Sequence, residues 1–481
     1  MHGQKNNHTN RVTVNIFRNG KDASKPFEPE WRCGDRILVT TQGSLGDLYP
    51  FLSLALQLRD RGYDVVIGTD PAHREKIEKH GLEFARVGAD WLCNPQVTER
   101  VRSWSLRRLI TDLLLPNLRR TYEETLAAAE GADAIITMQA NFAAGLVAEQ
   151  KNIPWVSGIP FPSAFFSAYD PPVLQPFPGL MEKLRCLGPA FWKPAKLLIK
   201  YVTTQWAREL LAFRKEIGLP SDPGFSAMAE CRSPFLHLAL FSGVLARKQR
   251  DWPGQTVLTG FAWYDRDNST LPDELVRFLD AGEPPIVFSL GSAIGRIRHE
   301  QEFFTQSAKV ARAIGRRAVL MVNKNWSGAC ALPPDVIAVE YAPFLELLPR
   351  SAAFVHHGGI GSTAIAMRTG CPQLVVPCGW DQYDNAARVR RLGLARILPR
   401  SRYTIARAAA ELHPLITQTG YRERATAVAG QLEEEDGSDV AADAITALLR
   451  ERRYFTADQP VRVREYEEAF LHDELPELAV E

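Results

Sequence analysis

Short apolar runs alternate with longer segments of helical period along most of this chain. Each run is followed by a turn and then by a segment whose apolar residues recur every three or four positions. This alternation predicts an α/β protein of parallel β-α-β units, with two doubly wound sheets facing a cleft. The first series of expected strands is Ile37–Thr41, Val65–Gly68, Phe84–Val87, Ala134–Thr137 and Trp155–Gly158. The second series is Ile286–Leu290, Ala318–Val322, Val336–Val339, Ala353–Val355 and Leu374–Val376.

Turn residues and breaks in the pattern divide the chain into parts. The polar N-terminus has no sustained period, and Pro- and Gly-containing turns separate the two series of strands. The predicted parts are a flexible extension at 1–34, a first domain at 35–245, a linker at 246–275, a second domain at 276–435, and a C-terminal helix with an acidic tail at 436–481.

Composition narrows the class of protein. The chain has 481 residues with 57 Lys plus Arg against 56 Asp plus Glu, so no net charge attracts the whole molecule to nucleic acid. Its 7 cysteines form no C-x-x-C pair, which is typical of reduced thiols and predicts a cytoplasmic protein. No apolar run reaches the roughly 20 residues that a membrane span needs, and no signal peptide is evident.

The loop after the first expected strand is the first candidate for chemistry, because ligands of open parallel sheets bind beyond the carboxyl ends of the strands. It spans Gln42–Asp47 and reads QGSLGD. Its glycines allow a ligand to approach closely, and the Asp47 carboxylate can act as a general base. The alternative is that Asp47 only caps a helix expected to start near Pro50. A dinucleotide-binding G-x-G-x-x-G loop is excluded because Leu48 fills the third glycine position.

A second candidate loop spans Val355–Thr363 and reads VHHGGIGST. Glycines before a helix leave backbone amides open to an anion, so the loop suits a diphosphate flanked by imidazole rings. A Walker loop is excluded because it needs a Gly-Lys-Ser/Thr sequence and this loop has no lysine. Metal binding by His356 and His357, or a turn without function, are the alternatives, although no third ligand stands at a fixed spacing.

A third candidate loop spans Pro377–Ala386. Trp380, Asp381 and Gln382 offer a flat apolar face and paired polar groups, which suit the hydroxyls of a carbohydrate. Helix capping by Asp381 is the alternative. The loop that ends at Ser292 adds further amides and a hydroxyl for a phosphate.

Together these loops resemble the donor-binding signature of the UDP-glycosyltransferase superfamily. The matching order is His357-x-Gly359-x-x-Ser362, Gly370-x-Pro372, Pro377 and Asp381-Gln382-x-x-Asn385-Ala386. The wider likeness covers residues 36–450 and looks closest to the branch of lipid rhamnosyltransferases and sterol 3-beta-glucosyltransferases. The resemblance implies the GT-B fold, in which a first Rossmann-like domain binds the acceptor and a second binds the nucleotide sugar.

The resemblance also implies a role for each matching residue. Asp47 aligns with the catalytic histidine of plant and animal members, because Gly46-Asp47-x-x-Pro50 matches their Gly-His-x-x-Pro. The residues implied at the donor diphosphate are His357, Gly359, Gly361, Ser362 and Ser292. Those implied at the transferred sugar are Trp380, Asp381 and Gln382, and those at the nucleobase are Tyr341 and Phe344.

The implied reaction is an inverting displacement in which Asp47 removes a proton from an acceptor hydroxyl. A helix N-terminus and His357 would stabilise the leaving phosphate, so no metal is expected and no cofactor besides the nucleotide-sugar co-substrate. Two positions depart from the plant pattern. Met138–Asn141 lacks the aspartate that orients the plant base, and Ile365 replaces a glutamate that holds the ribose. The second departure keeps a dTDP-sugar open as a donor beside a UDP-sugar.

The acceptor is expected against the first domain, with Phe161–Pro178 as a pocket loop or a packed connection, and the resemblance favours a hydrophobic lipid or sterol-like molecule. Segments 104–120 and 184–200 are basic and apolar. They can lie peripherally on the inner face of an anionic membrane or form ordinary solvated helix faces. The alternatives are glycosylation of a polyketide or other secondary metabolite, a GT-B sugar-nucleotide epimerase, and a non-catalytic sugar-nucleotide binder. The Asp265–Asp267 triplet reads as a surface turn.

Overall fold

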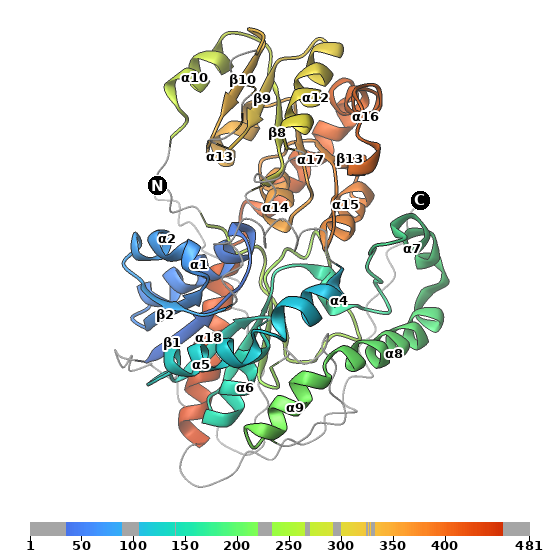
Figure 1. The fold of residues 1–481 in the computed structure, drawn as a ribbon. Helices are drawn as coiled ribbons and strands as arrows, with labels where there is room; N and C mark the ends of the chain where they lie inside the picture. The colour runs from blue at the N-terminus through green and yellow to red at the C-terminus, as the bar shows by residue number, and fades with distance from the viewer. Residues whose placement is uncertain are drawn as a thin grey trace, which may run out of the picture.

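The computed structural model contains two parallel β-sheets, one in each half of the chain (Figure 1). It describes residues 35–88, 105–139, 141–219, 233–264, 270–291, 300–323, 326, 328 and 332–455. The extension predicted at 1–34, the Asp265–Asp267 triplet, Ser292 and the acidic tail lie outside the described residues.

The first sheet has seven strands, and all of its neighbouring strands are parallel. Their order across the sheet is β3 (Glu83–Arg86), β2 (Asp64–Thr69), β1 (Arg36–Thr40), β4 (Ala134–Met138), β5 (Trp155–Ile159), β6 (Leu236–Ala239) and β7 (Thr256–Leu258). Val39 of the central strand β1 is in register with Ile67 of β2 and Ile136 of β4.

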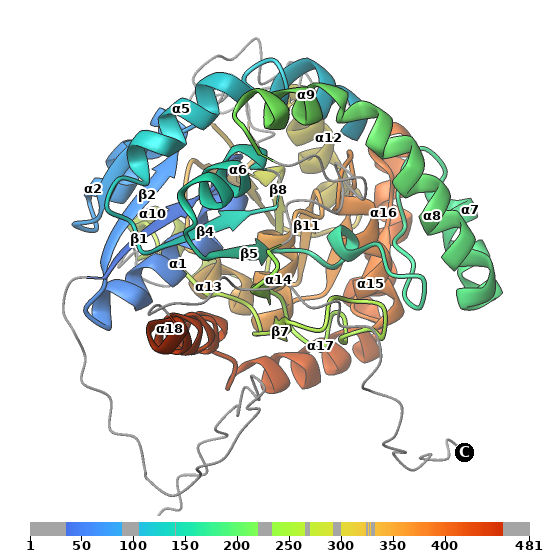
Figure 2. The ribbon, with the colours of Figure 1, turned by 90° about the horizontal axis from the view of Figure 1, so that it is seen from below.

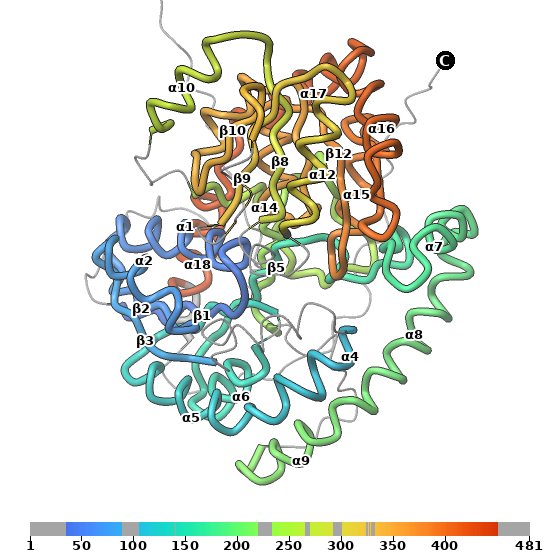
Figure 3. The backbone as a smooth tube through the Cα atoms, turned by 45° about the horizontal axis from the view of Figure 1, so that its top comes forward, coloured from blue at the N-terminus to red at the C-terminus, as the bar shows by residue number. Residues whose placement is uncertain are grey.

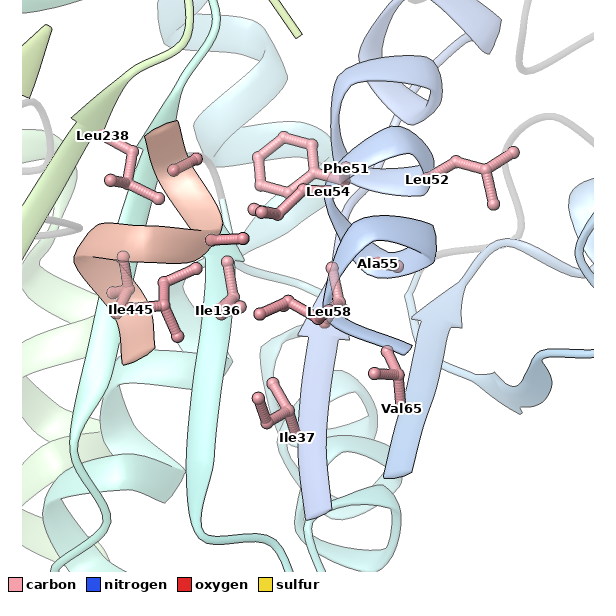
Figure 4. Packing of buried hydrophobic residues seen from close by; sticks show 14 of the residues in the cluster. Ile37, Phe51, Leu52, Leu54, Ala55, Leu58, Val65, Ile136, Leu238 and Ile445 are labelled. Carbon is pink, nitrogen blue, oxygen red and sulfur yellow. The ribbon is translucent and has the colours of Figure 1, made fainter. Parts of the chain in front are cut away.

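Alternate residues of β1 enter two different cores, because side chains of a strand point to opposite faces. Ile37 and Val39 pack with α1 (Leu45–Asp60) and α18 (Gly437–Phe455), as Figure 4 shows for Ile37, Phe51 and Ile445. Leu38 instead packs with α5 (Leu118–Ala128), α6 (Phe142–Lys151) and α9 (Arg208–Glu216). The sheet is therefore covered by helices on both faces.

Other helices of the first half are shorter or lie at its edge (Figure 3). They are η1 (Pro71–His73), α2 (Arg74–Glu78), α4 (Leu106–Arg108), η2 (Leu109–Leu114), η3 (Pro162–Phe165), α7 (Pro178–Leu184), η4 (Arg185–Leu187) and α8 (Gly188–Trp206). Among the described residues, no helix is both long enough and apolar enough to cross a membrane.

The second sheet has six parallel strands. Their order is β10 (Val336–Val339), β9 (Ala318–Met321), β8 (Ile286–Ser289), β11 (Ala353–His356), β12 (Gln373–Val375) and β13 (Ala395–Ile397). Its helices are α10 (Asp273–Asp280), α12 (Glu300–Ala313), α13 (Phe344–Leu347), η6 (Leu348–Arg350), α14 (Ile360–Arg368), α15 (Gln382–Arg391), η7 (Arg400–Arg402), α16 (Ile405–Thr417) and α17 (Thr419–Leu432).

The two halves share a hydrophobic cluster, and the last helix of the chain crosses from the second half back to the first. Phe241 and Trp252 of the first half pack in one cluster with Met367 and Val428 of the second. After α17 the chain returns to the first half, where α18 lies beside α1 (Figure 2). Glu435 lies at this crossing and accepts a hydrogen bond from the Ser242 hydroxyl at 2.6 Å.

Two boundaries differ from those predicted. The strand β7 lies within the 246–275 segment assigned to the linker, because it pairs with β6 and extends the first sheet. A strand of three residues shows no period in the sequence, so periodicity does not reveal it. The first helix begins at Leu45 and not near Pro50, since Ser44 and Asp47 form a capping box that starts it earlier.

Candidate active site

Asp47 is held by the loop that precedes α1. Its Oδ2 accepts hydrogen bonds from the Ser44 backbone amide at 2.8 Å and from the Ser44 hydroxyl at 3.0 Å. Gly43 has a φ of 128°, and a Cβ at Gly43 would lie 2.3 Å from Asp47 Oδ2, so only glycine leaves room for the carboxylate. Asp47 therefore caps its helix with Oδ2, and its Oδ1 has no hydrogen-bond partner among the described residues.

His73 steadies the same loop from the end of η1. This histidine is buried, and its Nε2 lies 2.9 Å from the Gly43 carbonyl oxygen. Because a carbonyl only accepts, Nε2 carries the proton. Burial raises the pKa of Asp47 above its usual range, although the Ser44 hydrogen bonds and His73 act in the opposite direction. A carboxylate with a raised pKa is a stronger base. His73 carries no motif in the sequence, so only the fold reveals its contact with this loop.

The two adjacent histidines of the second loop, His356 and His357, lie in different surroundings. His356 ends β11 inside the protein, where its Nδ1 accepts from the Gly358 amide at 3.1 Å and its Nε2 lies 3.0 Å from Gln373 Oε1. Burial and the neighbouring His357 lower the pKa of His356 to about 3, so this ring is neutral at physiological pH. His356 is a structural residue that fixes the turn of the loop.

The His357 ring lies between two glycines that belong to loops of different strands. A Cβ at Gly291 would lie 2.3 Å from His357 Cε1, and one at Gly359 would lie 2.4 Å from its Nε2. Gly359 is also the N-cap of α14, whose first amides have no partner within the helix. Gly361 and Ser362 belong to that first turn. The geometry brings an imidazole and open amides to one place, as an anion requires.

The third loop is tied to the second by a short series of hydrogen bonds. Asn385 donates from Nδ2 to Asp381 Oδ2 at 2.7 Å and to the Gly358 carbonyl at 3.0 Å. Gln382 uses its Oε1 to accept from the amides of Cys378 and Gly379 at 2.8 and 3.1 Å. No described residue forms a hydrogen bond with its side-chain amide nitrogen.

Trp380 has a left-handed backbone. Its φ of 58° is unusual for a bulky residue and marks a strained position at the start of α15. Such strain persists only where the surrounding structure enforces it. Here the Gln382 hydrogen bonds hold the preceding turn.

The loops of the two halves meet at a very close approach. A Cβ at Gly361 would lie 4.0 Å from the Gly46 Cα, so the first turn of α14 nearly contacts the first turn of α1. Burial and the negative charge of Asp47 raise the pKa of Asp381 to about 7. The negative charges of Asp47 and Asp381 therefore repel each other across the junction of the two halves.

The remaining predicted site residues differ in burial. Tyr341 is 53% exposed at the end of β10, whereas Phe344 packs into the core with its ring 5.1 Å from that of Phe354. Of this pair, Tyr341 is the one that can meet a nucleobase. Ile365 lies partly buried among apolar side chains, so its position offers no carboxylate. Ser292 is outside the described residues.

A buried ionic network joins the acceptor-side loop to the donor-side helix. Arg388 of α15 donates to Asp384 at 2.7 Å and to Asp170 of the first half at 2.5 Å, and it is 3% exposed. Asp384 also accepts from the Val173 amide at 2.9 Å. Burial alone would raise the pKa of Asp170, but Arg388 and Arg185 outweigh it and hold that pKa below its usual range.

A small pocket opens beside the Asp47 loop, at the carboxyl ends of β1 and β4. Its empty volume is about 240 Å³, part of which is open to solvent. Its lining is mostly apolar and consists of Gln42, Leu114, Asn117, Leu118, Thr121, Asn141, Phe142 and Ala143. Asn141 donates to Thr40 Oγ1 at 3.0 Å, and its buried Oδ1 has no hydrogen-bond partner among the described residues. Within the described ranges, no group of three or more His, Cys, Asp or Glu is arranged to hold a metal ion.

Comparison with known proteins identifies the family. Residues 37–164 match the glycosyltransferase family 28 N-terminal domain, and residues 309–450 match the erythromycin biosynthesis protein CIII-like C-terminal domain. O-mycaminosyltylonolide 6-deoxyallosyltransferase of Streptomyces fradiae is 32% identical over 415 residues, covering 84% of this chain and 96% of that protein. The chain is a glycosyltransferase.

Other relatives of this glycosyltransferase differ in the molecule they are named for. Vancomycin aglycone glucosyltransferase of Amycolatopsis orientalis is 30% identical, covering 87% of this chain and 98% of that protein. A sterol 3-beta-glucosyltransferase of Arabidopsis thaliana is 26% identical, covering 75% of this chain and 57% of that protein.

Solved structures show the fold. The calicheamicin glycosyltransferase CalG4 superimposes with a TM-score of 0.64 at 20% identity, covering 87% of this chain and 98% of that one. VinC, a glycosyltransferase solved in complex with dTDP, gives a TM-score of 0.59 at 21% identity, covering 86% of this chain and all of that one. This glycosyltransferase therefore has the GT-B fold that its sequence motifs imply.

Proposed function

We propose that this glycosyltransferase moves a sugar from a nucleoside diphosphate to a hydroxyl of a hydrophobic acceptor, with inversion and with Asp47 as the base. The observation that carries the proposal is the junction of the two halves. There the Asp47 loop approaches the first turn of α14 at Gly46 and Gly361, while Asp47 and Asp381 interact electrostatically. A base from one domain and an anion site from the other are then within reach of one substrate pair.

The proposed step is a single displacement. The acceptor oxygen attacks the anomeric carbon as the bond from that carbon to the diphosphate oxygen breaks, and the hydroxyl proton passes to Asp47. The departing diphosphate takes the electron pair and gains negative charge. The open amides of α14 and the His357 imidazole are the groups placed to stabilise that charge, so no metal is needed. Asp381 and the Gln382 amide nitrogen would hold the sugar hydroxyls, beside Trp380.

We infer that the donor is a dTDP-sugar, with a UDP-sugar as the second candidate. Ile365 gives no carboxylate for a pair of ribose hydroxyls, which a deoxyribose does not need. The VinC structure, which shares the fold, was solved with dTDP. Tyr341 is the exposed ring that would meet the base of either nucleotide.

We infer that the acceptor is a large hydrophobic molecule of the polyketide class, with a sterol or other lipid as the second candidate. Leu114, Leu118, Phe142 and Ala143 give the small pocket beside the Asp47 loop an apolar wall, which supports a hydrophobic group of the acceptor there. The relative at 32% identity is named for a macrolide substrate and a more distant one for sterols. The macrolide-type acceptor therefore takes precedence over the lipid that the sequence motifs alone favoured.

A donor-by-acceptor panel tests the proposal. The purified enzyme would be incubated with dTDP- and UDP-hexoses and 6-deoxyhexoses, together with O-mycaminosyltylonolide, vancomycin aglycone or a sterol. The expected result is a sugar mass increment on one acceptor with equal release of nucleoside diphosphate, and product formation at least about 100-fold slower from Asp47→Asn. Failure of both nucleotide families to bind would overturn the proposal, and product from a sterol alone would replace the polyketide assignment.

A further inference from the structure

Residues 177–206, which form α7, η4 and α8, expose many large apolar side chains. Leu197, Leu198 and Tyr201 are 68%, 64% and 67% exposed, far more than is usual for such residues. We call this surface the α7–α8 face. Its exposed large apolar residues are Phe177, Leu180, Leu187, Phe191, Leu197, Leu198, Tyr201 and Val202.

The face is continuous along α8. Leu187, Phe191, Pro194, Leu198 and Tyr201 follow one another at spacings of four and three, so they form one stripe on the helix. The opposite side of α8 packs on the protein through its two buried residues. Figures 1 and 3 show α8 running along the outer edge of the first domain, with its length away from both sheets. The stripe therefore belongs to no core of the described residues.

The charges on α8 have one sign, and the one carboxylate of residues 177–206, Glu182, is paired with arginines of α15. The sequence of α8 contains no Asp or Glu, while Lys193 and Lys200 are exposed along one margin of the stripe. Lys183 of α7 is also exposed. Lys196 lies on the inner side, where it pairs with Asp251 at 2.9 Å. An apolar stripe bordered by ammonium groups is complementary to a surface with negative headgroups above hydrocarbon.

The other basic and apolar segment behaves differently. In residues 105–120, Ile110, Leu113 and Leu118 are buried. The guanidinium groups of Arg119 and Arg120 pair with carboxylates at 2.6 and 2.9 Å. This segment is an ordinary packed helix face, so the two segments that look alike in sequence differ in the fold.

We propose that the α7–α8 face docks this glycosyltransferase on an anionic lipid bilayer. The apolar stripe enters the headgroup boundary, and Lys193 and Lys200 meet lipid phosphates. A second copy of the chain is a poorer occupant, because a symmetric contact of α8 with itself brings lysine to lysine without an acidic partner on the helix.

The docked face is connected to the reaction cleft. Glu182 of α7 pairs with Arg390 and Arg391 of the donor-side helix α15 at 3.3 and 3.1 Å. Arg185 of η4 pairs with Asp170, a member of the buried network that reaches Asp384. A hydrophobic acceptor dissolved in the bilayer would thus be delivered at the rim of the cleft, a consequence that rests on the proposed function.

Vesicle binding tests the docking without donor or acceptor, so its result does not depend on the proposed reaction. The full-length protein would be sedimented with vesicles of phosphatidylcholine alone and of phosphatidylcholine with phosphatidylglycerol in equal parts. Binding is expected to the mixed vesicles and to weaken with salt. Lys193→Gln with Lys200→Gln should lower the partition coefficient by about 25-fold, because each lysine near an anionic surface contributes roughly fivefold.

The double variant Leu198→Ser, Tyr201→Ser should abolish binding, because it removes apolar area from the stripe and leaves the charge unchanged. Matched controls are Lys309→Gln on α12 and Leu106→Ser on α4, which alter exposed side chains of the same kinds elsewhere and should bind as the wild type does. Equal binding to both vesicle types, or no binding to either, would overturn the proposal. A dimer that Leu198→Ser with Tyr201→Ser converts to a monomer, without vesicle binding, would assign the face to a second copy.

Discussion

Contacts within the donor side of the molecule and contacts between the donor side and the acceptor side span very different distances along the sequence. Within the donor side, Asn385 reaches Asp381 four residues away and Gly358 on the preceding loop, 27 residues away. Contacts between the two sides span far more sequence, since Asp170 meets Arg388 across 218 positions. Local contacts can be read from a motif. Distant ones depend on how two domains meet, so the acceptor side is where members of one fold can differ.

The largest expected effect separates catalysis from donor binding. Asp47→Asn removes the base but keeps a partner for the Ser44 amide, so kcat should fall by about 10²- to 10⁴-fold with donor affinity unchanged. Product formation and donor binding by calorimetry would be measured on the same sample. Ser44→Ala is the control, because it loses one hydrogen bond to the carboxylate and keeps the base. Unchanged turnover in Asp47→Asn would remove the catalytic assignment.

The buried network should carry the next largest effect, on stability. Arg388→Met leaves Asp384 buried without its cation and should lower the free energy of unfolding by about 3–5 kcal/mol. Arg391→Met, on the same helix, breaks a partly exposed pair and should cost at most about 1 kcal/mol. Urea unfolding of both variants makes the comparison, and equal losses would contradict it.

Asp170 should make the stability that this network contributes depend on pH. Because its pKa in the folded protein lies below the unfolded value of about 3.9, its contribution to stability is complete above that pH. The contribution should disappear as the pH falls through the folded pKa. Urea unfolding of Asp170→Asn should therefore show a weaker acid dependence than wild type.

A smaller effect is expected at the donor anion site. His357→Ala should weaken donor binding by about tenfold or more, as loss of a hydrogen bond to a charged group costs roughly 1.5–3 kcal/mol. Gly291→Ala should reproduce part of the loss, since its Cβ would strike the His357 ring. Calorimetry with dTDP alone measures both variants. Wild-type affinity in His357→Ala would place the diphosphate elsewhere.

The smallest effect concerns the facing carboxylates. Asp47→Asn removes a like charge beside Asp381, so the pKa of Asp381 should fall below about 7. Since the folded pKa of Asp381 is raised to about 7, its ionisation opposes folding. The donor-free wild type should therefore lose stability as pH rises from about 4 towards 7, and Asp381→Asn should lose less. Melting temperatures over that range measure this, and parallel curves would refute it.

The alternation of apolar runs was enough to predict two parallel-sheet domains, and motif spacing was enough to bring the candidate loops together. Strands β6, β7 and β13 were missed because their short sequences LHLA, TVL and ARI each mix a polar residue with the apolar ones. The position of Arg388 in a buried network was also unreadable, because arginine in a helix is ordinarily solvated.

What the sequence by itself determined was therefore the local chemistry: which loops hold glycines, carboxylates and imidazoles, and in what order. Only the tertiary structure decided that Asp47 shares its charge environment with Asp381, that His73 supports the Gly43 turn, and that His356 is structural while the His357 ring lies between Gly291 and Gly359. It also decided which of two similar basic segments stays exposed. The physical reason is that burial and charge interaction depend on distances in space, which strand and helix periods along the sequence do not encode.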